Sequence, residues 1–317
     1  MPRPSNFYDF SHSPWWAEKT KTMIFLATPK VNPRGQGCNK MEANVFSRAT
    51  WRLLNTGYSD GVTNMAIDEA LMRSVSVGRS LPTLRFYAWE PPCVSIGYNQ
   101  SLRDEVDLDR CREKGYTWVR RPTGGRAVLH IDELTYSVVA PVGEPRVAGD
   151  IVTSYRRISL GLLAGLQSLG GSVYQAGHME KTGNEMKSAA CFEVPSHYEV
   201  TALGRKLVGS AQVRRMGVVL QHGSLPLTGD VSRLVEVLKL PEAERDRLRQ
   251  VLHERAIALD EALGRQVSFD EAAEAVARGF SEAMNLDWDL SELSENELTD
   301  VESLKPQYLG EEWTYSK

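Results

Sequence analysis

The stretch that decides the fold is residues 120–141, which read RRPTGGRAVLHIDELTYSVVAP. A Pro-Thr-Gly-Gly turn stands between runs rich in β-branched and aromatic residues, and such runs predict strands. Glycine lets the backbone pass close to a ligand, so Gly124 and Gly125 would expose N–H groups to an anion or a carbonyl. Arg120, Arg121 and Arg126 add positive charge. On the local pattern alone, a glycine hairpin with solvated arginines is the commoner structure.

Two further segments carry candidate chemistry. Residues 205–215, RKLVGSAQVRR, place Lys206 after a turn, and Gly209 and Ser210 are small where strands prefer bulk, which leaves room for a ligand. A surface hairpin lysine would explain Lys206 equally simply. Residues 189–200, AACFEVPSHYEV, place Cys191 in a loop that contains Pro. A thiol near a cation can become a nucleophile, although most lone cysteines are packed thiols.

Outward from these segments, strands and helices alternate without a strict βαβ repeat. Strands are expected at residues 84–89, 93–98, 116–121, 133–141 and 206–214, and at the run GVVLQHGSL. The last two are expected to join residues 197–203 in one β-meander. Helices are expected after Asn64 as N-cap, at residues 107–114 and 151–169, and after the capping boxes Ser268–Glu271 and Ser294–Glu297. We therefore predict an α+β fold with a large mixed sheet flanked by helices.

The ends of the chain differ from its middle. Residues 1–48 show no hydrophobic period and are expected to be a disordered or loosely docked extension. Residues 49–317 would form the catalytic domain, with residues 228–317 mainly helical. Residues 287–317 carry a net charge of −7, within a total of −4 for the chain. The overall negative charge disfavours a nucleic-acid partner, whereas two basic segments without carboxylates, residues 120–130 and 202–215, suit an anionic small ligand or an acidic protein.

Composition excludes several classes of protein. A hydrophobic fraction of 42% with 25% charged residues is globular, and no apolar run is long enough to span a membrane. Four cysteines at irregular spacing give neither a disulfide framework nor a zinc pattern, and we expect the cytoplasm. A P-loop, a dinucleotide fingerprint and a G-x-S-x-G elbow are all missing from the sequence, so we predict no metal and no cofactor.

Taken together, five ordered motifs resemble the biotin/lipoate protein ligase and acyltransferase family. The motifs are NMAIDEAL (residues 64–71), RRPTGGRAVLH (120–130), ELTYSVV (133–139), GRKLVGSAQ (204–212) and LQHGSL (220–225). The context of Cys191, CFEVPSHYE, is similar to that of the nucleophile in octanoyltransferases of the LipM type. His197 departs from that pattern, because Trp is usual there. The resemblance covers the chain from about Trp51 to its end.

The resemblance implies roles for particular residues. Cys191 would be the nucleophile, and Lys206 the lysine that the family uses at the acyl carbonyl. Arg121, Gly124, Gly125, Arg126, His130, Gly209 and Ser210 would line the substrate pocket. An apolar tunnel would hold the seven-carbon tail, with chain length sensed at about 0.8 kcal/mol per CH₂.

The implied activity is transfer of an octanoyl group through an acyl-cysteine. The donor would be octanoyl-acyl carrier protein, and the acceptor a lysine of a lipoyl-domain protein such as glycine cleavage H protein. Two alternatives within the family remain, an ATP-dependent lipoate–protein ligase and an amidotransferase that moves octanoyl between lipoyl proteins. A module that binds lipoate or a lipoyl domain without turnover is a third, which the presence of both Cys191 and Lys206 disfavours.

Overall fold

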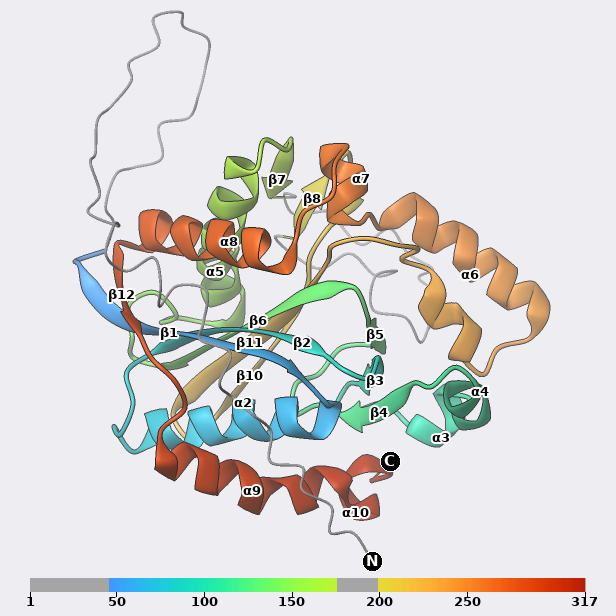
Figure 1. Cartoon of the computed structure of the whole chain (residues 1–317), viewed down its shortest axis with the longest axis horizontal. Helices are drawn as coiled ribbons and strands as arrows, with labels where there is room; N and C mark the ends of the chain where they lie inside the picture. Colours follow the sequence, from blue (N-terminus) through green and yellow to red (C-terminus); the bar gives the residue numbers. More distant parts are fainter. Residues whose placement is uncertain (1–45, 176–198, 317) are drawn as a thin grey trace, which may run out of the picture. The chain divides into compact units, whose positions relative to one another are not determined.

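The computed structural model describes residues 46–175 and 199–316, all within the compact unit Asn44–Lys317. A mixed six-stranded sheet forms its centre, with the strand order β10-β11-β6-β2-β1-β12 (Figure 1). β1 pairs in parallel with β2 and β12, and β6 pairs antiparallel with β2 and β11, which in turn pairs antiparallel with β10. The strands are β1 (Ala49–Ser59), β2 (Thr83–Trp89), β6 (Glu133–Pro141), β10 (Gly209–Arg215), β11 (Val218–Pro226) and β12 (Leu286–Leu290).

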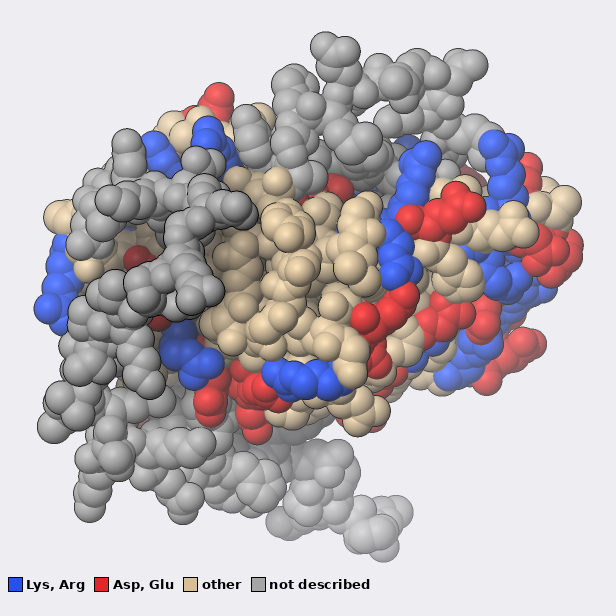
Figure 2. Space-filling view, turned by 90° about the horizontal axis from the view of Figure 1, so that it is seen from above, with Lys and Arg blue, Asp and Glu red and all other residues tan. Residues whose placement is uncertain are grey.

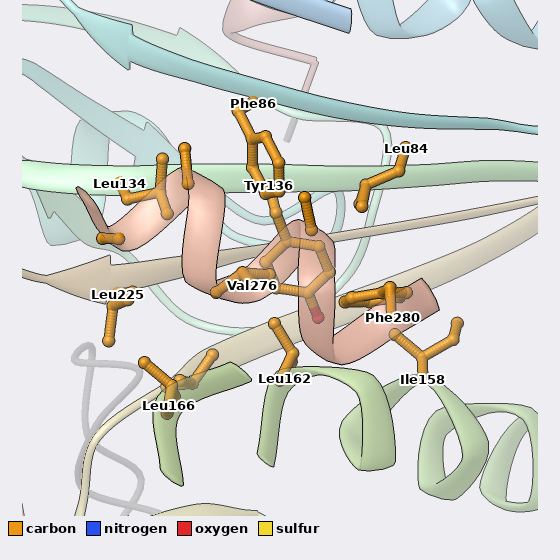
Figure 3. Packing of buried hydrophobic residues seen from close by; sticks show 14 of the residues in the cluster. Leu84, Phe86, Leu134, Tyr136, Ile158, Leu162, Leu166, Leu225, Val276 and Phe280 are labelled. Carbon is orange, nitrogen blue, oxygen red and sulfur yellow. The ribbon is translucent and has the colours of Figure 1, made fainter. Parts of the chain in front are cut away.

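Helix pairs cover both faces of this sheet. On one face lie α2 (Gly61–Ser76) and α9 (Glu295–Leu309), and on the other α5 (Ile151–Ser168) and α8 (Phe269–Met284) (Figure 1). Because neighbouring residues of a strand point to opposite faces, β6 sends Leu134 and Tyr136 toward α5 and α8. Figure 3 shows Tyr136 among Phe86, Leu162, Val276 and Phe280 in this core. The arrangement brings the opposite face of β2 and β6 against α2.

The crossing of α5 and α8 depends on glycine. A Cβ atom added at Gly165 would lie 2.6 Å from the Cα of Val276, and one added at Gly161 would lie 2.7 Å from the Phe280 ring. Both separations are too short for carbon atoms, so only glycine permits this close approach.

Two three-stranded sheets and several short helices complete the unit. The first small sheet has the order β4-β3-β5 and the second the order β7-β8-β9. Their strands are β3 (Cys93–Ile96), β4 (Thr117–Arg120), β5 (Val128–His130), β7 (Val173–Gln175), β8 (Val200–Ala202) and β9 (Arg205–Lys206). The remaining helices are α3 (Leu102–Glu105), α4 (Leu108–Glu113), α6 (Glu242–Arg255), α7 (Leu259–Leu263), α10 (Glu311–Thr314) and the 3₁₀ helix η2 (Arg233–Val237).

The predicted α+β class, with a mixed sheet, flanking helices and a helical C-terminal region, is confirmed. The N-cap of α9 is the predicted capping box, in which Ser294 and Glu297 bind each other's backbone N–H. At α8, Ser268 caps the helix by accepting from the N–H of Glu271. The Glu271 carboxylate there pairs with Arg265 at 2.8 Å.

Three predictions about elements were wrong, and one strand was not predicted. The N-cap of α2 is Asp60, which accepts from the N–H of Thr63, and Asn64 lies buried inside the helix. The strand predicted at residues 206–214 is divided, because Leu207 and Val208 turn inward and both donate to the Val200 carbonyl. β9 and β10 therefore belong to different sheets, and no single meander forms. The strand β12 was not predicted within the helical C-terminal region.

The boundary at residue 48 cuts through contacts that the structure describes. The backbone carbonyls of Phe46 and Ser47 accept from Asn285 and Arg146, and the Arg48 guanidinium pairs with Asp287. We expect a chain that starts at Met41 to keep its melting temperature and activity, because it retains these contacts. A chain that starts at Ala49 should melt a few degrees lower, since it loses two hydrogen bonds to backbone carbonyls, each worth about 1 kcal/mol. Differential scanning calorimetry of both truncations tests this, and a large loss in the first would assign a structural role to residues 1–40.

Charged side chains are mixed on the face viewed in Figure 2, where Lys and Arg alternate with Asp and Glu toward the end that holds α6. No helix in the described part of the chain combines the length and the apolar character needed to cross a bilayer.

Candidate active site

The Gly124–Gly125 turn is a crossover and not a hairpin. It joins β4 to β5, and these strands lie on opposite sides of β3. Gly125 has φ +92°, a conformation that other residues rarely adopt. The Cβ of any other residue at Gly97 would overlap the Gly125 carbonyl. The turn is therefore held against the end of β3. The hairpin alternative is wrong, because β4 and β5 each pair with β3 and not with each other.

Two of the three arginines in this segment donate hydrogen bonds to backbone carbonyl groups. Arg121 is buried and donates to the carbonyls of Ser95, Gly124 and Arg126 at 2.7–3.0 Å, so its guanidinium fixes the shape of the turn. The Arg120 guanidinium donates to five backbone carbonyls, of residues 97, 98, 100, 313 and 314. The expectation that Arg120 offers its charge to a ligand is therefore wrong, because its donors are occupied.

Four of the predicted substrate-binding residues meet at one pocket, which we name the central pocket. It lies where β10 and β11 face β5 and the ends of β2 and β3. Its lining comprises Met65, Tyr87, Trp89, Ser95, Arg121, Val128, His130, Thr135, Gly209, Ser210, Ala211, His222, Gly223 and Ser224. A Cβ at Gly125 would lie 3.9 Å from the Ala211 side chain, which places the turn beside this pocket. Gly124 and Arg126 flank that position but do not line the pocket.

Both ring nitrogens of His130 have hydrogen-bond partners, and an aromatic ring stacks on the imidazole plane. Its Nε2 lies 2.7 Å from the Ser95 hydroxyl, and its Nδ1 lies 2.7 Å from a carboxylate oxygen of Glu133. The indole of Trp89 stacks on the imidazole with 3.9 Å between ring centroids. The same Glu133 carboxylate accepts from Thr135 and Ser224. Because each of these groups has a partner, they form a rigid polar wall of the pocket.

A second polar cluster joins α2 to β11. The Nδ1 of His222 lies 3.1 Å from Asp68, and its Nε2 lies 2.7 Å from the Thr123 hydroxyl. Arg85 and Tyr87 also donate to Asp68. Burial alone would raise the pKa of Asp68, but the hydrogen bond from His222 and the charge of Arg85 hold that pKa below its usual value.

Burial lowers the pKa of His222, and the hydrogen bond to Asp68 offsets only part of this effect. The neutral ring then donates from Nδ1 to Asp68 and accepts from Thr123, which ties the glycine turn to the sheet.

This lowered pKa predicts that acid destabilises the fold through His222. Below pH about 6.5 the unfolded chain binds a proton at this residue that the folded chain does not bind. The stability that His222 contributes is therefore present above that pH and is lost as the pH falls, by up to about 1.4 kcal/mol per pH unit. Urea unfolding at pH 7.5 and 5.5 should show a smaller loss in His222→Gln than in the wild type. Equal losses in the two proteins would contradict the prediction.

Lys206 is buried, with a side chain that is 7% exposed, so the surface-lysine alternative is wrong. Its Nζ lies 2.6 Å from Oε1 of Glu199, a carboxylate that is itself buried. The Lys206 carbonyl accepts from Ile257, which anchors β9 to the segment between α6 and α7. Lys206 does not line the central pocket but stands three residues before Gly209, which does.

Cys191 falls outside the described residues, and its predicted role is therefore not tested here. Of the cysteines that are described, Cys93 and Cys111 are free and buried. Burial raises the pKa of Cys93 to about 12 and that of Cys111 to about 11. Neither thiol supplies a thiolate near neutral pH, so both pack as small apolar side chains. Within residues 46–175 and 199–316, no group of His, Cys, Asp and Glu side chains could hold a metal ion.

Several residues of this site were not predicted from the sequence. Asp68 and His222 lie within two of the five motifs, and Glu199 ends the CFEVPSHYE segment, yet none received a role. An ionisable residue within a motif was the available signal. Met65, Tyr87 and Trp89 show only as ordinary core residues in their elements, so nothing local marks them as pocket residues.

Comparisons with known proteins agree on one family. The family model described as the lipoyl protein ligase A/B catalytic domain matches residues 60–281. An octanoyltransferase LipM of Kyrpidia tusciae is 47% identical over 84% of this chain and 99% of its own length. The Moorella thermoacetica octanoyltransferase LipM is 48% identical over 83% and 97%.

Solved structures show the same fold. The bipartite lipoate protein ligase of Thermoplasma acidophilum is 30% identical, with a TM-score of 0.70 over 84% of this chain and 96% of its own. A lipoate-protein ligase A bound with ATP gives a TM-score of 0.68 at 30% identity, over 84% of this chain and 98% of its own. With a family model over most of the catalytic unit and relatives that match along nearly their full length, this chain belongs to the lipoyl protein ligase A/B catalytic domain family.

Proposed function

We propose that this chain transfers an octanoyl group from octanoyl-acyl carrier protein to a lysine of a lipoyl-domain protein. The observation that carries the proposal is the identity of nearly half the residues with octanoyltransferases, over almost their entire length. The two ligases of known structure named above are more distant, at 30% identity. The chain is an octanoyltransferase of protein lipoylation.

The central pocket supports an acyl substrate. Met65, Tyr87, Trp89, Val128 and Ala211 offer apolar surface, while the polar groups beside them already bind one another. Burying the octanoyl tail there would contribute about 0.8 kcal/mol per CH₂ group.

Catalysis would take two steps, and Cys191 is the proposed nucleophile. In the first, its sulfur attacks the thioester carbonyl, the bond to the carrier thiol breaks, and the departing thiolate takes up the proton lost from Cys191. In the second, the amine of the acceptor lysine attacks the acyl-cysteine, an amide forms, and the Cys191 thiolate leaves and is reprotonated. Lys206 would stabilise the negative oxygen in both steps.

The acceptor is proposed first as a class of protein and then as one candidate of that class. A lipoyl protein is the acceptor, and a ligase of the same fold is described together with its E2 lipoyl domain. Glycine cleavage H protein is a candidate acceptor. We propose the cytosol as the compartment, because a catalytic thiol stays reduced there.

Intact-mass spectrometry tests the proposal. The protein is mixed with octanoyl-acyl carrier protein in the absence of nucleotide, and a mass increase of one octanoyl group is expected. A lipoyl domain added next should take up the group and return the protein to its original mass. A protein that modifies the lipoyl domain only with ATP and free lipoate would be a ligase, the activity named for the ATP-bound structural relative.

A further inference from the structure

A second cavity, which we name the side cavity, lies behind the wall of the central pocket. The two spaces share Val128 and Ser224 as lining residues. The other residues of the side cavity are Leu129, Ile131, Glu133, Pro226, Thr228, Gly229, Asp230, Val231, Arg233, Leu234 and Leu252. Exposed Gly229 and Asp230 mark its mouth, and buried Glu133 and Ser224 mark its inner end. The cavity thus leads from the surface toward the central pocket.

The shared wall lies close to the expected site of chemistry. Ser224 pairs directly with Gly209 in the β10–β11 ladder. Gly209 in turn lies three residues beyond Lys206 in the sequence. Leu252, which lines the side cavity, belongs to α6, and the segment that follows α6 binds the Lys206 carbonyl through Ile257. The two spaces therefore adjoin each other beside Ser224 and Gly209.

The charged side chains along the side cavity already have hydrogen-bond or ion-pair partners. The Glu133 carboxylate accepts from His130, Thr135 and Ser224. Asp230 binds His253 at 2.8 Å, and Arg233 binds Asp132 at 2.7 Å. A triphosphate would need available cations, and an ammonium group would need an available carboxylate. The cavity suits an uncharged chain with amide and hydroxyl groups, with apolar contacts from Leu129, Val231 and Leu234.

We propose that the side cavity binds the pantetheine arm of the thioester donor. The inference rests on the proposed function. A thioester carries two chains on one carbonyl group, an acyl chain and a thiol arm, and two spaces that meet at one wall would hold one chain each. The thiol arm of an acyl carrier protein is long, flexible and built from amides, which matches the neutral lining. The acyl chain then occupies the central pocket, and the carrier protein stays outside the mouth at Gly229 and Asp230.

The test compares two small donors with the same acyl group, S-octanoyl-pantetheine and S-octanoyl-2-mercaptoethanol. The Leu129→Trp variant fills the side cavity, because Leu129 lines this space but not the central pocket. We expect acylation by the pantetheine ester to fall about tenfold or more, a change of about 1.4 kcal/mol. Acylation by the mercaptoethanol ester should stay within about twofold of wild type. This result would show that the reaction site of the variant remains folded. Leu129→Met conserves volume and is the matched control, and Val231→Trp repeats the test from the mouth.

Each other outcome overturns the inference. Equal loss with both donors would mean that the tryptophan disturbs the reaction site, and no loss would mean that the arm lies elsewhere. A slower transfer from preformed octanoyl-enzyme to a lipoyl domain, with normal acylation, would assign the cavity to the acceptor lysine. Competition by ATP against the pantetheine ester would assign it to a nucleotide. If the wild type forms no adduct with octanoyl-acyl carrier protein, the proposed function itself has failed; an adduct with the carrier protein but with neither ester would mean that the cavity does not bind the arm by itself.

Discussion

Replacing Cys191 by serine is expected to abolish the octanoyl adduct and the transfer activity. A serine hydroxyl is not ionised near neutral pH and lacks the nucleophilicity of a thiolate, so no acyl-enzyme accumulates. Loss of a covalent nucleophile lowers turnover by as much as about 10⁶-fold. The readout is intact mass after mixing with octanoyl-acyl carrier protein, together with transfer to a lipoyl domain.

The other cysteines provide the controls for that experiment. Cys38→Ser should keep the adduct, because Cys38 lies in the extension that we expect to be dispensable. Cys93 and Cys111 remain in Cys191→Ser, but both are buried with raised pKa values and should not take up the acyl group. An adduct that persists in Cys191→Ser would remove the proposed role from this residue.

Replacing Lys206 by methionine is expected to have two separate effects. Acylation should fall by about 10²–10³, the usual cost of losing a donor to the developing oxyanion. Stability should fall as well, because the buried Glu199 carboxylate would lose its ion pair with Lys206, and breaking a buried pair costs up to about 3–5 kcal/mol. Lys206→Arg should restore little activity, since a planar guanidinium does not replace a compact ammonium group.

A second substitution separates the two effects. In Lys206→Met/Glu199→Gln the buried negative charge is removed together with the lysine, so the melting temperature should recover much of its loss while acylation stays low. Glu199→Gln alone reports how much the carboxylate positions the lysine. Recovery of both stability and acylation in the double variant would show that Lys206 is only a structural partner of Glu199.

Local sequence patterns predicted the elements better than their pairing. Residues 133–141 form β6 with the predicted limits, because alternating side chains and flanking turn residues act within the strand itself. Ser294 and Glu297 were identified as a cap for the same reason. The parallel pairing of β12 with β1 left no such signal, since its partner lies more than 230 residues away and the pairing depends on packing against α8.

The sequence by itself determined the α+β class, the glycine turn and the family, because each rests on residues that are adjacent or ordered in motifs. Only the tertiary structure decided what those residues contact. It divided residues 206–214 between two sheets, buried Lys206 against Glu199, and brought Asp68 to His222, 154 positions away. The physical reason is that burial and ion pairing are set by the packing of whole sheets and helices, and a residue's immediate neighbours along the chain do not encode that packing.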